Sequence, residues 1–270
     1  MLEYDMKTVA VDLVRQAGAL LRRQFGASHQ VRSKGDVSNI VTESDIAAER
    51  LLVEGLRSNF PTHSIIAEES GCDLRASDYL WIIDPLDGSS NFAAGLPWFG
   101  VLLALLHKGQ PVLGLLYLPM SDELYEAEKG RGARRNGQAI RVTACVELAG
   151  VLWNVGMDSS PDEGRRRACA ESLVRLLQRV RNVRATNCLL DAAFTADGRI
   201  GGVLNHSERL WDIAAPMLIV QEAGGRFTDP QGRPLALDLS ARAAERDYAV
   251  LAGAPALHAA VVELLRYSRI

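Results

Sequence analysis

The sequence at residues 79–92 is YLWIIDPLDGSSNF. Its first five residues are apolar and rich in side chains that favour β-structure, so they predict a buried strand. Asp84 and Asp87 follow, and a proline restricts the backbone between them. Gly88 allows the main chain to bend closely around a ligand, and two serine hydroxyls come next. The stretch therefore predicts a strand that carries two carboxylates at its carboxyl end, where the active sites of α/β layers commonly lie.

An alternative is that Asp84 and Asp87 only organise a turn and cap a helix. We favour a functional site because two carboxylates, a proline, a glycine and paired hydroxyls all follow one apolar strand. A helix that starts at the hydroxyls would place free N–H groups, and so an anion site, beside the carboxylates. Acids beside an anion site indicate cations between them. An EF-hand is excluded because the Asp spacing, the sixth-position glycine and the terminal Glu are missing.

Three further acidic clusters occur in the chain. A short apolar strand ends at Glu68 and Glu69, which should face opposite sides and have different roles. Asp212 lies in the first turn of a predicted apolar helix. Its alternative role is only to stabilise that helix through a favourable interaction with the helix dipole. Thr42 and Asp45 fit a capping box, and Asp45 can still hydrogen-bond a water molecule.

These groups offer carboxylates and hydroxyls with no His or Cys nearby, which is the hard-oxygen ligand set that Mg²⁺ prefers. Two metal ions about 3.5–4 Å apart can hold a phosphoryl group and activate a water molecule. The P-loop of NTPases and the nucleophile elbow of serine hydrolases are both absent from the sequence. Magnesium chemistry on a phosphate is therefore the function that the residues favour.

The composition fits this interpretation. The chain has 270 residues, of which 48% are hydrophobic and 23% charged, as is typical of a soluble globular protein. A net charge of -3 provides no broad cationic field, so small molecules are favoured as partners over nucleic acid or membrane.

The N-terminus lacks the pattern of a signal peptide, and the longest apolar run, 101–106, is too short to span a bilayer. The four cysteines have no metal-binding spacing, so we expect free thiols and a cytoplasmic protein.

The chain divides into two patterns. Residues 5–25 and 42–56 predict two amphipathic helices that precede any strand, and closely spaced apolar runs up to residue 127 then predict a largely antiparallel sheet backed by these helices. After about residue 143, strand and helix candidates alternate, which is typical of an α/β unit. We therefore expect two parts that share a cleft, 1–145 with most of the metal ligands and 146–270 with Asp212.

Several segments resemble the inositol monophosphatase family, whose members are magnesium-dependent, lithium-sensitive phosphatases. Residues 84–92 match the family pattern Asp-Pro-Ile/Leu-Asp-Gly-Thr/Ser-x-Asn-Phe, residues 211–215 match Trp-Asp-x-Ala-Ala, and residues 68–70 match Glu-Glu-Ser. Residues 130–137 resemble the Gly-x-Gly-Ala-x-x-Asn-Gly hairpin of the family, although Arg134 replaces its usual aromatic residue. The resemblance covers almost the whole chain.

This resemblance implies a layered αβαβα sugar-phosphatase fold of the α/β class, and hydrolysis of a phosphate monoester by metal-activated water. It assigns one Mg²⁺ to Glu68, Asp84 and the Leu86 carbonyl, and a second to Asp84, Asp87 and Asp212. A third, weaker Mg²⁺ can bind beside Glu68, and residues 34–36 resemble the mobile loop that flanks it.

The resemblance also assigns catalytic and binding roles. Asp45, Glu68 and Ser89 are the catalytic set, in which Ser89 and Asp45 position the attacking water. The amides of Gly88 and Ser89 bind the phosphate. A homodimer is expected on the resemblance alone.

The substrate is left open by the sequence, because this fold serves several phosphate esters. Inositol-specific members carry a substrate-contacting Glu seven residues before the aspartate of the Trp-Asp motif, and Asn205 occupies that position here. The wall at residues 186–189 also departs from the family. We therefore expect inositol 1-phosphate to be accepted without strong preference. Fructose 1,6-bisphosphate, 3′-phosphoadenosine 5′-phosphate and histidinol phosphate are the alternatives. A non-catalytic Mg²⁺- or anion-binding regulator, or an interaction module without an active centre, is the alternative from another class.

Overall fold

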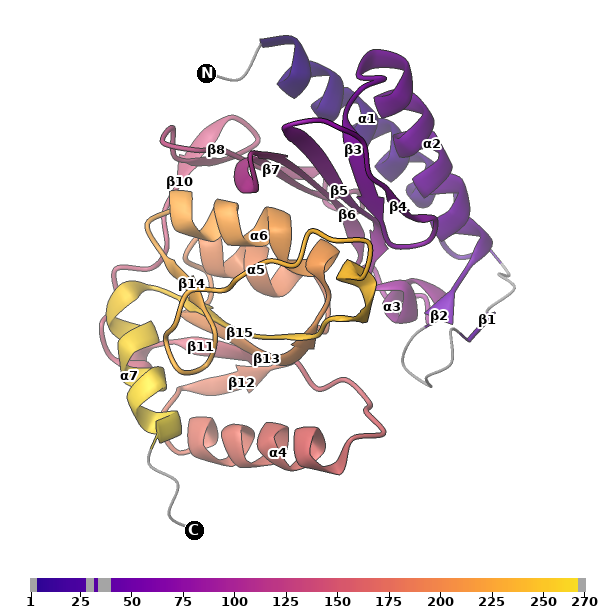
Figure 1. Ribbon diagram of the computed structural model, residues 1–270. Coiled ribbons are helices and arrows are strands. Elements are labelled where there is room, and N and C mark those ends of the chain that lie inside the picture. The colour runs from indigo at the N-terminus through magenta and orange to yellow at the C-terminus, as the bar shows by residue number, and fades with distance from the viewer. Residues whose placement is uncertain (1–3, 28–31, 34–39, 267–270) are drawn as a thin grey trace.

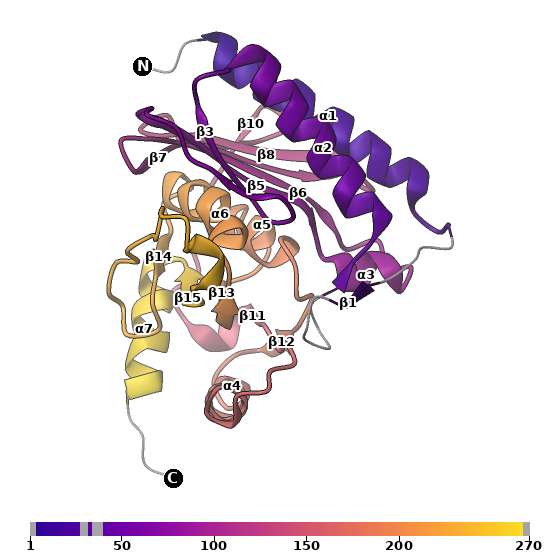
Figure 2. The same ribbon diagram turned by 45° about the vertical axis from the view of Figure 1, so that its right-hand side comes forward.

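The chain folds into five alternating layers of helix and sheet (Figures 1 and 2), and a computed structural model describes its residues 4–27, 32–33 and 40–266. From one outer layer to the other, the helices that form the layers are α1 (Tyr4–Gln24), α2 (Glu43–Asn59), α5 (Leu190–Ala196), α6 (Leu210–Glu222), α4 (Glu163–Leu177) and α7 (Pro255–Arg266). The first two cover an eight-stranded sheet, the middle two lie between the sheets, and the last two cover a five-stranded sheet. The predicted αβαβα fold is confirmed.

The eight-stranded sheet lies under α1 and α2. In spatial order its strands are β10 (Gln138–Ile140), β9 (Ala133–Arg135), β8 (Glu123–Glu128), β7 (Gln110–Leu118), β6 (Gly100–His107), β5 (Tyr79–Asp87), β3 (Ser64–Ala67) and β4 (Gly71–Asp73). Every neighbouring pair is antiparallel except β3 and β5. The predicted antiparallel character of this sheet is therefore confirmed.

The five-stranded sheet is mixed. In spatial order its strands are β12 (Asn182–Arg184), β11 (Leu152–Val155), β13 (Gly202–Glu208), β15 (Tyr248–Gly253) and β14 (Arg226–Thr228). β11 is parallel to both β12 and β13, as the alternating strand-helix pattern predicts, whereas β15 is antiparallel to β13 and β14.

β5 shows why the sequence is apolar without interruption before Asp84. Trp81 and Ile83 pack in the core shared with α1 and α2, while Leu80 and Ile82 face the central layer with α6. Both faces of the strand are covered, so both sets of alternating side chains must be apolar. The central layer thereby joins segments from both parts of the chain, and the boundary near residue 145 stays a prediction.

The sequence did not indicate the shortest strands. β1 (Arg32–Ser33) and β2 (Ile40–Val41) form an antiparallel pair between α1 and α2, so the expectation that two helices precede any strand is wrong. A strand of two residues is too short to produce an alternating pattern in the sequence. Its pairing depends on the tertiary structure around it.

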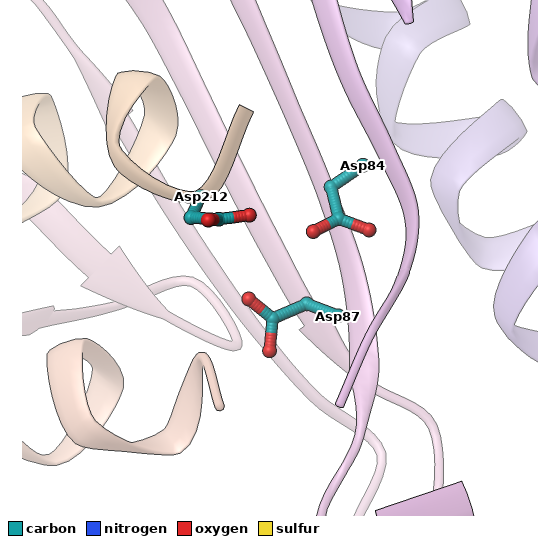
Figure 3. A group of neighbouring side chains, drawn as sticks. All are labelled: Asp84, Asp87 and Asp212. Atoms are coloured by element: carbon teal, nitrogen blue, oxygen red, sulfur yellow. The ribbon is translucent and has the colours of Figure 1, made fainter. Parts of the chain in front are cut away.

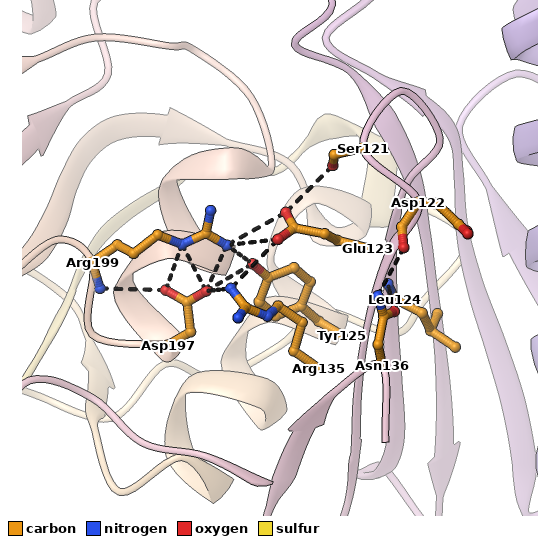
Figure 4. A network of polar contacts seen from close by, with 9 residues as sticks. All are labelled: Ser121, Asp122, Glu123, Leu124, Tyr125, Arg135, Asn136, Asp197 and Arg199. Atoms are coloured by element: carbon orange, nitrogen blue, oxygen red, sulfur yellow. Dashed lines mark hydrogen bonds and ion pairs between the residues drawn. The ribbon is translucent and has the colours of Figure 1, made fainter. Parts of the chain in front are cut away.

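A polar network joins the eight-stranded sheet to the segment after α5 (Figure 4). Asp197 accepts hydrogen bonds from Tyr125 Oη at 2.9 Å and from Arg135 Nη1 at 2.9 Å, and it lies 2.6 Å from Arg199 Nη2. Glu123 also pairs with Arg199, at 3.3 Å. We call these five residues the Asp197 network. It connects β8 and β9 to the second part of the chain.

No helix in the described ranges combines the length and the apolar character needed to cross a bilayer. The four cysteines are free thiols, as predicted.

Candidate active site

An irregularity in β5 brings Asp84 and Asp87 to the same side of the sheet. Asp84 pairs with Leu102 of β6 and Asp87 pairs with Gly100, so three steps along β5 match two along β6. Residues three apart on a regular strand would face opposite sides. The extra residue of this β-bulge instead turns both side chains to the same side of the sheet. Pro85, which has no N–H to donate, lies within the bulge.

Asp212 reaches the same point from α6 (Figure 3). It is the third residue of that helix, where its Oδ2 accepts a hydrogen bond of 2.6 Å from the backbone N–H of Arg209. One carboxylate oxygen from each of Asp84, Asp87 and Asp212 lies within 4.8 Å of the other two. The backbone N–H of Leu189 donates to Asp87 Oδ1 at 2.7 Å, which ties this carboxylate to the start of α5. The structure thus brings together three of the predicted metal ligands.

Glu68 approaches the three aspartates from the end of β3. Its backbone N–H donates to Ile83 O at 3.2 Å, and its side chain lines the same cavity. The loop that follows is anchored by Glu49 of α2, whose carboxylate accepts the amides of Glu69 and Ser70 at 2.7 Å each. Glu49 is a positioning residue that the sequence analysis missed, because nothing local to α2 indicates its distant partner.

Ser89, the first residue of α3 (Ser89–Ala93), lies between two acceptors. Its Oγ is 2.7 Å from Asp45 Oδ1 and 2.8 Å from Leu86 O, and its single proton can serve one of them at a time. The other oxygen of Asp45 accepts the backbone N–H of Thr42 at 2.8 Å and the Thr42 hydroxyl. The capping box predicted at the start of α2 is confirmed, and it holds a fully buried Asp45 against Ser89.

Both the backbone conformation and the lack of space require a glycine at position 88. Its φ of +89° is favourable only for glycine, and a Cβ there would lie 2.6 Å from the carbonyl oxygen of Trp98. The main chain can therefore pass directly under the cavity at the point where phosphate binding is expected.

The carboxylates raise one another's pKa values. Burial raises the pKa of Asp84 well above its ordinary 3.8, and Glu68, Asp87 and Asp212 raise it further. Burial and the charge of Asp212 likewise raise the pKa of Asp87. Burial also raises the pKa of Asp212, although the Arg209 amide opposes the effect. No Lys or Arg of the described ranges forms an ion pair with these three aspartates.

The cavity has a volume of about 770 Å³, and the predicted wall at residues 186–189 lines it. Asn205 also lines it, and its Nδ2 donates to Glu208 Oε1 at 2.6 Å and lies 3.4 Å from Asp158 Oδ2. Asp191 contributes another buried carboxyl group, and burial raises its pKa to about 7.

Glu208, Asp158 and Asp191 were missed by the sequence analysis. No motif contains them, and their approach depends on strand register and loop packing. The predicted loop at residues 34–36 lies outside the described residues.

The donor set of this cluster fits a divalent cation. Buried and half-buried carboxylates that repel one another, together with the Leu86 carbonyl, are the hard oxygen ligands that Mg²⁺ favours. Bound cations would offset the negative charge that the described part of the chain leaves uncompensated.

Comparison with known proteins agrees with this geometry. Residues 3–268 match the inositol monophosphatase family. The chain is 36% identical to inositol monophosphatase 2 of Solanum lycopersicum, over 87% of this chain and 90% of the relative. It is also 36% identical to a fructose-1,6-bisphosphatase/inositol-1-monophosphatase of Thermotoga maritima, with coverage of 85% and 86%. The crystal structure of extragenic suppressor protein suhB from Bartonella henselae superposes with a TM-score of 0.89 at 31% identity, over 98% of this chain and all of that one.

The chain therefore belongs to the inositol monophosphatase family. Its class of activity is that of a phosphatase, which hydrolyses phosphate monoesters.

Proposed function

We propose that this protein is a Mg²⁺-dependent phosphate monoester hydrolase, similar to inositol-1-monophosphatase, that uses metal-activated water. The observation that carries the proposal is the convergence of Asp84, Asp87 and Asp212 within 4.8 Å, with no basic partner in the described chain. Such a cluster is unfavourable by itself and favourable around divalent cations.

The ligands divide between two Mg²⁺ ions. Glu68, Asp84 and the Leu86 carbonyl would hold one, and Asp84, Asp87 and Asp212 would hold the other, with Asp84 shared by both. When bound, Mg²⁺ lowers the pKa of a coordinated water and offsets charge on the phosphate. A third ion beside Glu68 belongs to the same proposal.

The chain positions the water and the phosphate. Asp45 keeps the Ser89 hydroxyl oriented through the 2.7 Å hydrogen bond, and this hydroxyl in turn holds the attacking water. Thr42 donates to the other oxygen of Asp45, so this carboxylate is held in one orientation beside Ser89. The Gly88 and Ser89 amides bind the phosphate oxygens, because the left-handed Gly88 keeps the backbone close to the cavity.

For the substrate, we propose a small phosphate ester without strong preference for inositol 1-phosphate, since Asn205 occupies the position of the family's glutamate. Esters such as fructose 1,6-bisphosphate, 3′-phosphoadenosine 5′-phosphate and histidinol phosphate are tested beside it. A preference for inositol 1-phosphate of a hundredfold or more in kcat/KM, about 2.7 kcal/mol, would contradict this part of the proposal.

A phosphate-release assay tests the activity. The protein is incubated with inositol 1-phosphate and with p-nitrophenyl phosphate, in Mg²⁺ or in excess chelator, and free phosphate is measured with malachite green. Release that requires Mg²⁺ supports the proposal. Binding of Mg²⁺ without release from any ester would instead support a non-catalytic regulator.

Lithium sensitivity, a homodimer and a cytoplasmic location complete the proposal by family analogy. Lithium should inhibit phosphate release at saturating substrate, and light scattering should give twice the mass of one chain. A rate that is insensitive to lithium across a wide Mg²⁺ range would contradict the analogy, while leaving metal-dependent hydrolysis in place.

A further inference from the structure

The side-chain amide of Asn91 connects two sides of the cavity. Asn91 lies on α3, two residues after Ser89, and its Nδ2 donates to Trp98 O at 3.0 Å and to Thr186 O at 2.9 Å. An amide NH₂ group carries two N–H donors, and here each has a backbone carbonyl as its acceptor. Asn91 thereby joins the helix that begins at Ser89 to the wall at residues 186–189, although Thr186 lies 95 residues further along the chain.

The two ends of this wall are held differently. At its carboxyl end, Leu189 is 3% exposed in the central core, and its N–H donates to Asp87 Oδ1 at 2.7 Å. At its amino end, Thr186 and Asn187 are only partly buried, and polar contacts hold them. Because a close-packed core resists displacement, residues 186 and 187 can shift while the backbone beside Asp87 stays in place.

Asn91 links the amino end of the wall to the first part of the chain. The Thr186 hydroxyl donates to Asp191 Oδ1. Asn187 Nδ2 donates to Asp158 Oδ1 at 2.7 Å. Both of these acceptors belong to residues 146–270. Of the described hydrogen bonds of residues 186 and 187, the one from Asn91 is the bond that reaches the side of the cavity where phosphate binding is expected.

Gly88 lies directly against the same carbonyl and the same wall. A Cβ at Gly88 would lie 2.6 Å from Trp98 O and 3.1 Å from the Cβ of Cys188, so there is no space on either side. The carbonyl oxygen that limits Gly88 is also the one that accepts from Asn91. In the proposed function Gly88 binds phosphate and the wall faces the alcohol. Asn91 therefore sets the spacing between the sites for the two parts of the ester.

A role in the loop after α3 alone would need only part of this arrangement. The backbone carbonyl of Asn91 accepts the N–H of Leu96 at 2.8 Å, and the bond from Nδ2 to Trp98 O closes the same loop. The second bond from Nδ2, to Thr186 O, adds nothing to that loop. Its effect is on the position of the wall.

We propose that Asn91 is a positioning residue for the alcohol part of the substrate. It holds the wall at residues 186–189 against the phosphate-binding residues, so that a bound ester contacts both. This inference rests on the proposed phosphatase function and deepens it. Asn91 is not among the groups that would bind Mg²⁺ or phosphate. Loss of its amide should therefore weaken binding of the alcohol and leave the phosphate chemistry in place.

Steady-state kinetics of Asn91→Ala separate these two kinds of binding. KM is measured for whichever of inositol 1-phosphate and the three alternative esters the wild type hydrolyses with the highest kcat/KM. Ki is measured for inorganic phosphate, which has no alcohol part. KM should rise about tenfold, while kcat and the Ki of phosphate stay within about threefold of wild type. Equal increases in KM and Ki, a loss confined to kcat, or no change in either constant would overturn the proposal.

Three further variants make the test independent of size and folding. Asn91→Leu keeps a similar size without an N–H donor, so it should raise KM as Asn91→Ala does, and a wild-type KM would overturn the proposal. Thr186→Val removes the hydroxyl that holds the same end of the wall through Asp191. It should give the same separation of KM from Ki, and an unchanged KM would again overturn the proposal. The matched control is Asn59→Ala, which should change neither constant, because the exposed Asn59 on α2 also donates to a backbone carbonyl, that of Gly55 at 2.8 Å.

The wild-type activity separates the two levels of failure. If the wild type hydrolyses an ester with Mg²⁺ and Asn91→Ala has the wild-type KM, only the role of Asn91 is refuted. If the wild type hydrolyses no ester with Mg²⁺, the proposed function is refuted and this inference with it.

Discussion

Two regions of this molecule bury carboxylates in opposite ways. In the Asp197 network, the side chain of Asp197 is only 3% exposed, and two guanidinium groups and a phenol hydroxyl contact it. In the candidate active site, Asp84, Asp87 and Asp212 meet without a basic partner from the described chain, and burial and mutual repulsion raise the pKa of each. In the Asp197 network, side chains of the protein itself balance the negative charge, and the network supports the fold. In the candidate active site the negative charge has to be balanced by a bound cation, and this marks the cluster as the functional site.

The largest effect is expected from removing one charge of the unbalanced region. Asp84→Asn should reduce phosphate release by about a thousandfold or more while the fold is kept, because the change removes a bridging ligand at constant size. With less repulsion, the metal-free variant should melt at the same or a higher temperature than the wild type. Release assays and circular dichroism check both points. A rate within about tenfold of wild type would show that Asp84 is not a bridging ligand.

Ser89 tests whether the site does more than hold cations. Ser89→Ala should lower kcat by about a hundredfold and change the Mg²⁺ dependence much less, since the hydroxyl orients water and carries no charge. Ser89→Thr keeps the hydroxyl and should stay active, which makes it the matched control. The measurement is kcat as a function of Mg²⁺ concentration. If the alanine variant keeps the wild-type kcat, Ser89 only stabilises the turn through Leu86 and Asp45.

In the Asp197 network, we expect a substitution to reduce stability and to leave the activity unchanged. Asp197→Asn leaves Arg135 and Arg199 without their shared carboxylate, and should lower the free energy of unfolding by about 2–3 kcal/mol. Urea denaturation measures this loss, and phosphate release per folded molecule should stay close to wild type. If Asp197→Asn removed activity without affecting stability, the contrast between the two regions would be wrong.

The pH dependence of magnesium stabilisation gives the smallest effect, a few degrees in Tm. Carboxyl groups whose pKa values are raised in the folded state bind more protons there than in the unfolded chain. The metal-free protein should therefore lose stability as the pH rises above about 4 towards neutrality. Mg²⁺ binds the ionised groups, so the increase in Tm that it causes should be larger at neutral pH than at acidic pH. Thermal melts in Mg²⁺ and in chelator measure it, and an increase that is independent of pH would contradict the account.

The sequence predicted much of this arrangement because its main features are local. The apolar run before Asp84, the capping box at Thr42 and the Trp-Asp start of α6 each lie within a few residues of one another. The approach of Glu208 and the anchoring of the Glu68 loop by Glu49 could not be predicted, because they depend on a β-bulge and on partners far apart in the sequence. The partners of Asp197 were unpredictable for the same reason, since Arg135 is 62 residues away.

The central claim is that divalent cations balance the carboxylates of Asp84, Asp87 and Asp212. Anomalous diffraction from crystals soaked in Mn²⁺, a substitute for Mg²⁺, tests it most directly. The account predicts one peak between these three aspartates, a second beside Glu68 and the Leu86 carbonyl, and none at Asp197. Saturating Mn²⁺ with no peak among the three aspartates would contradict it.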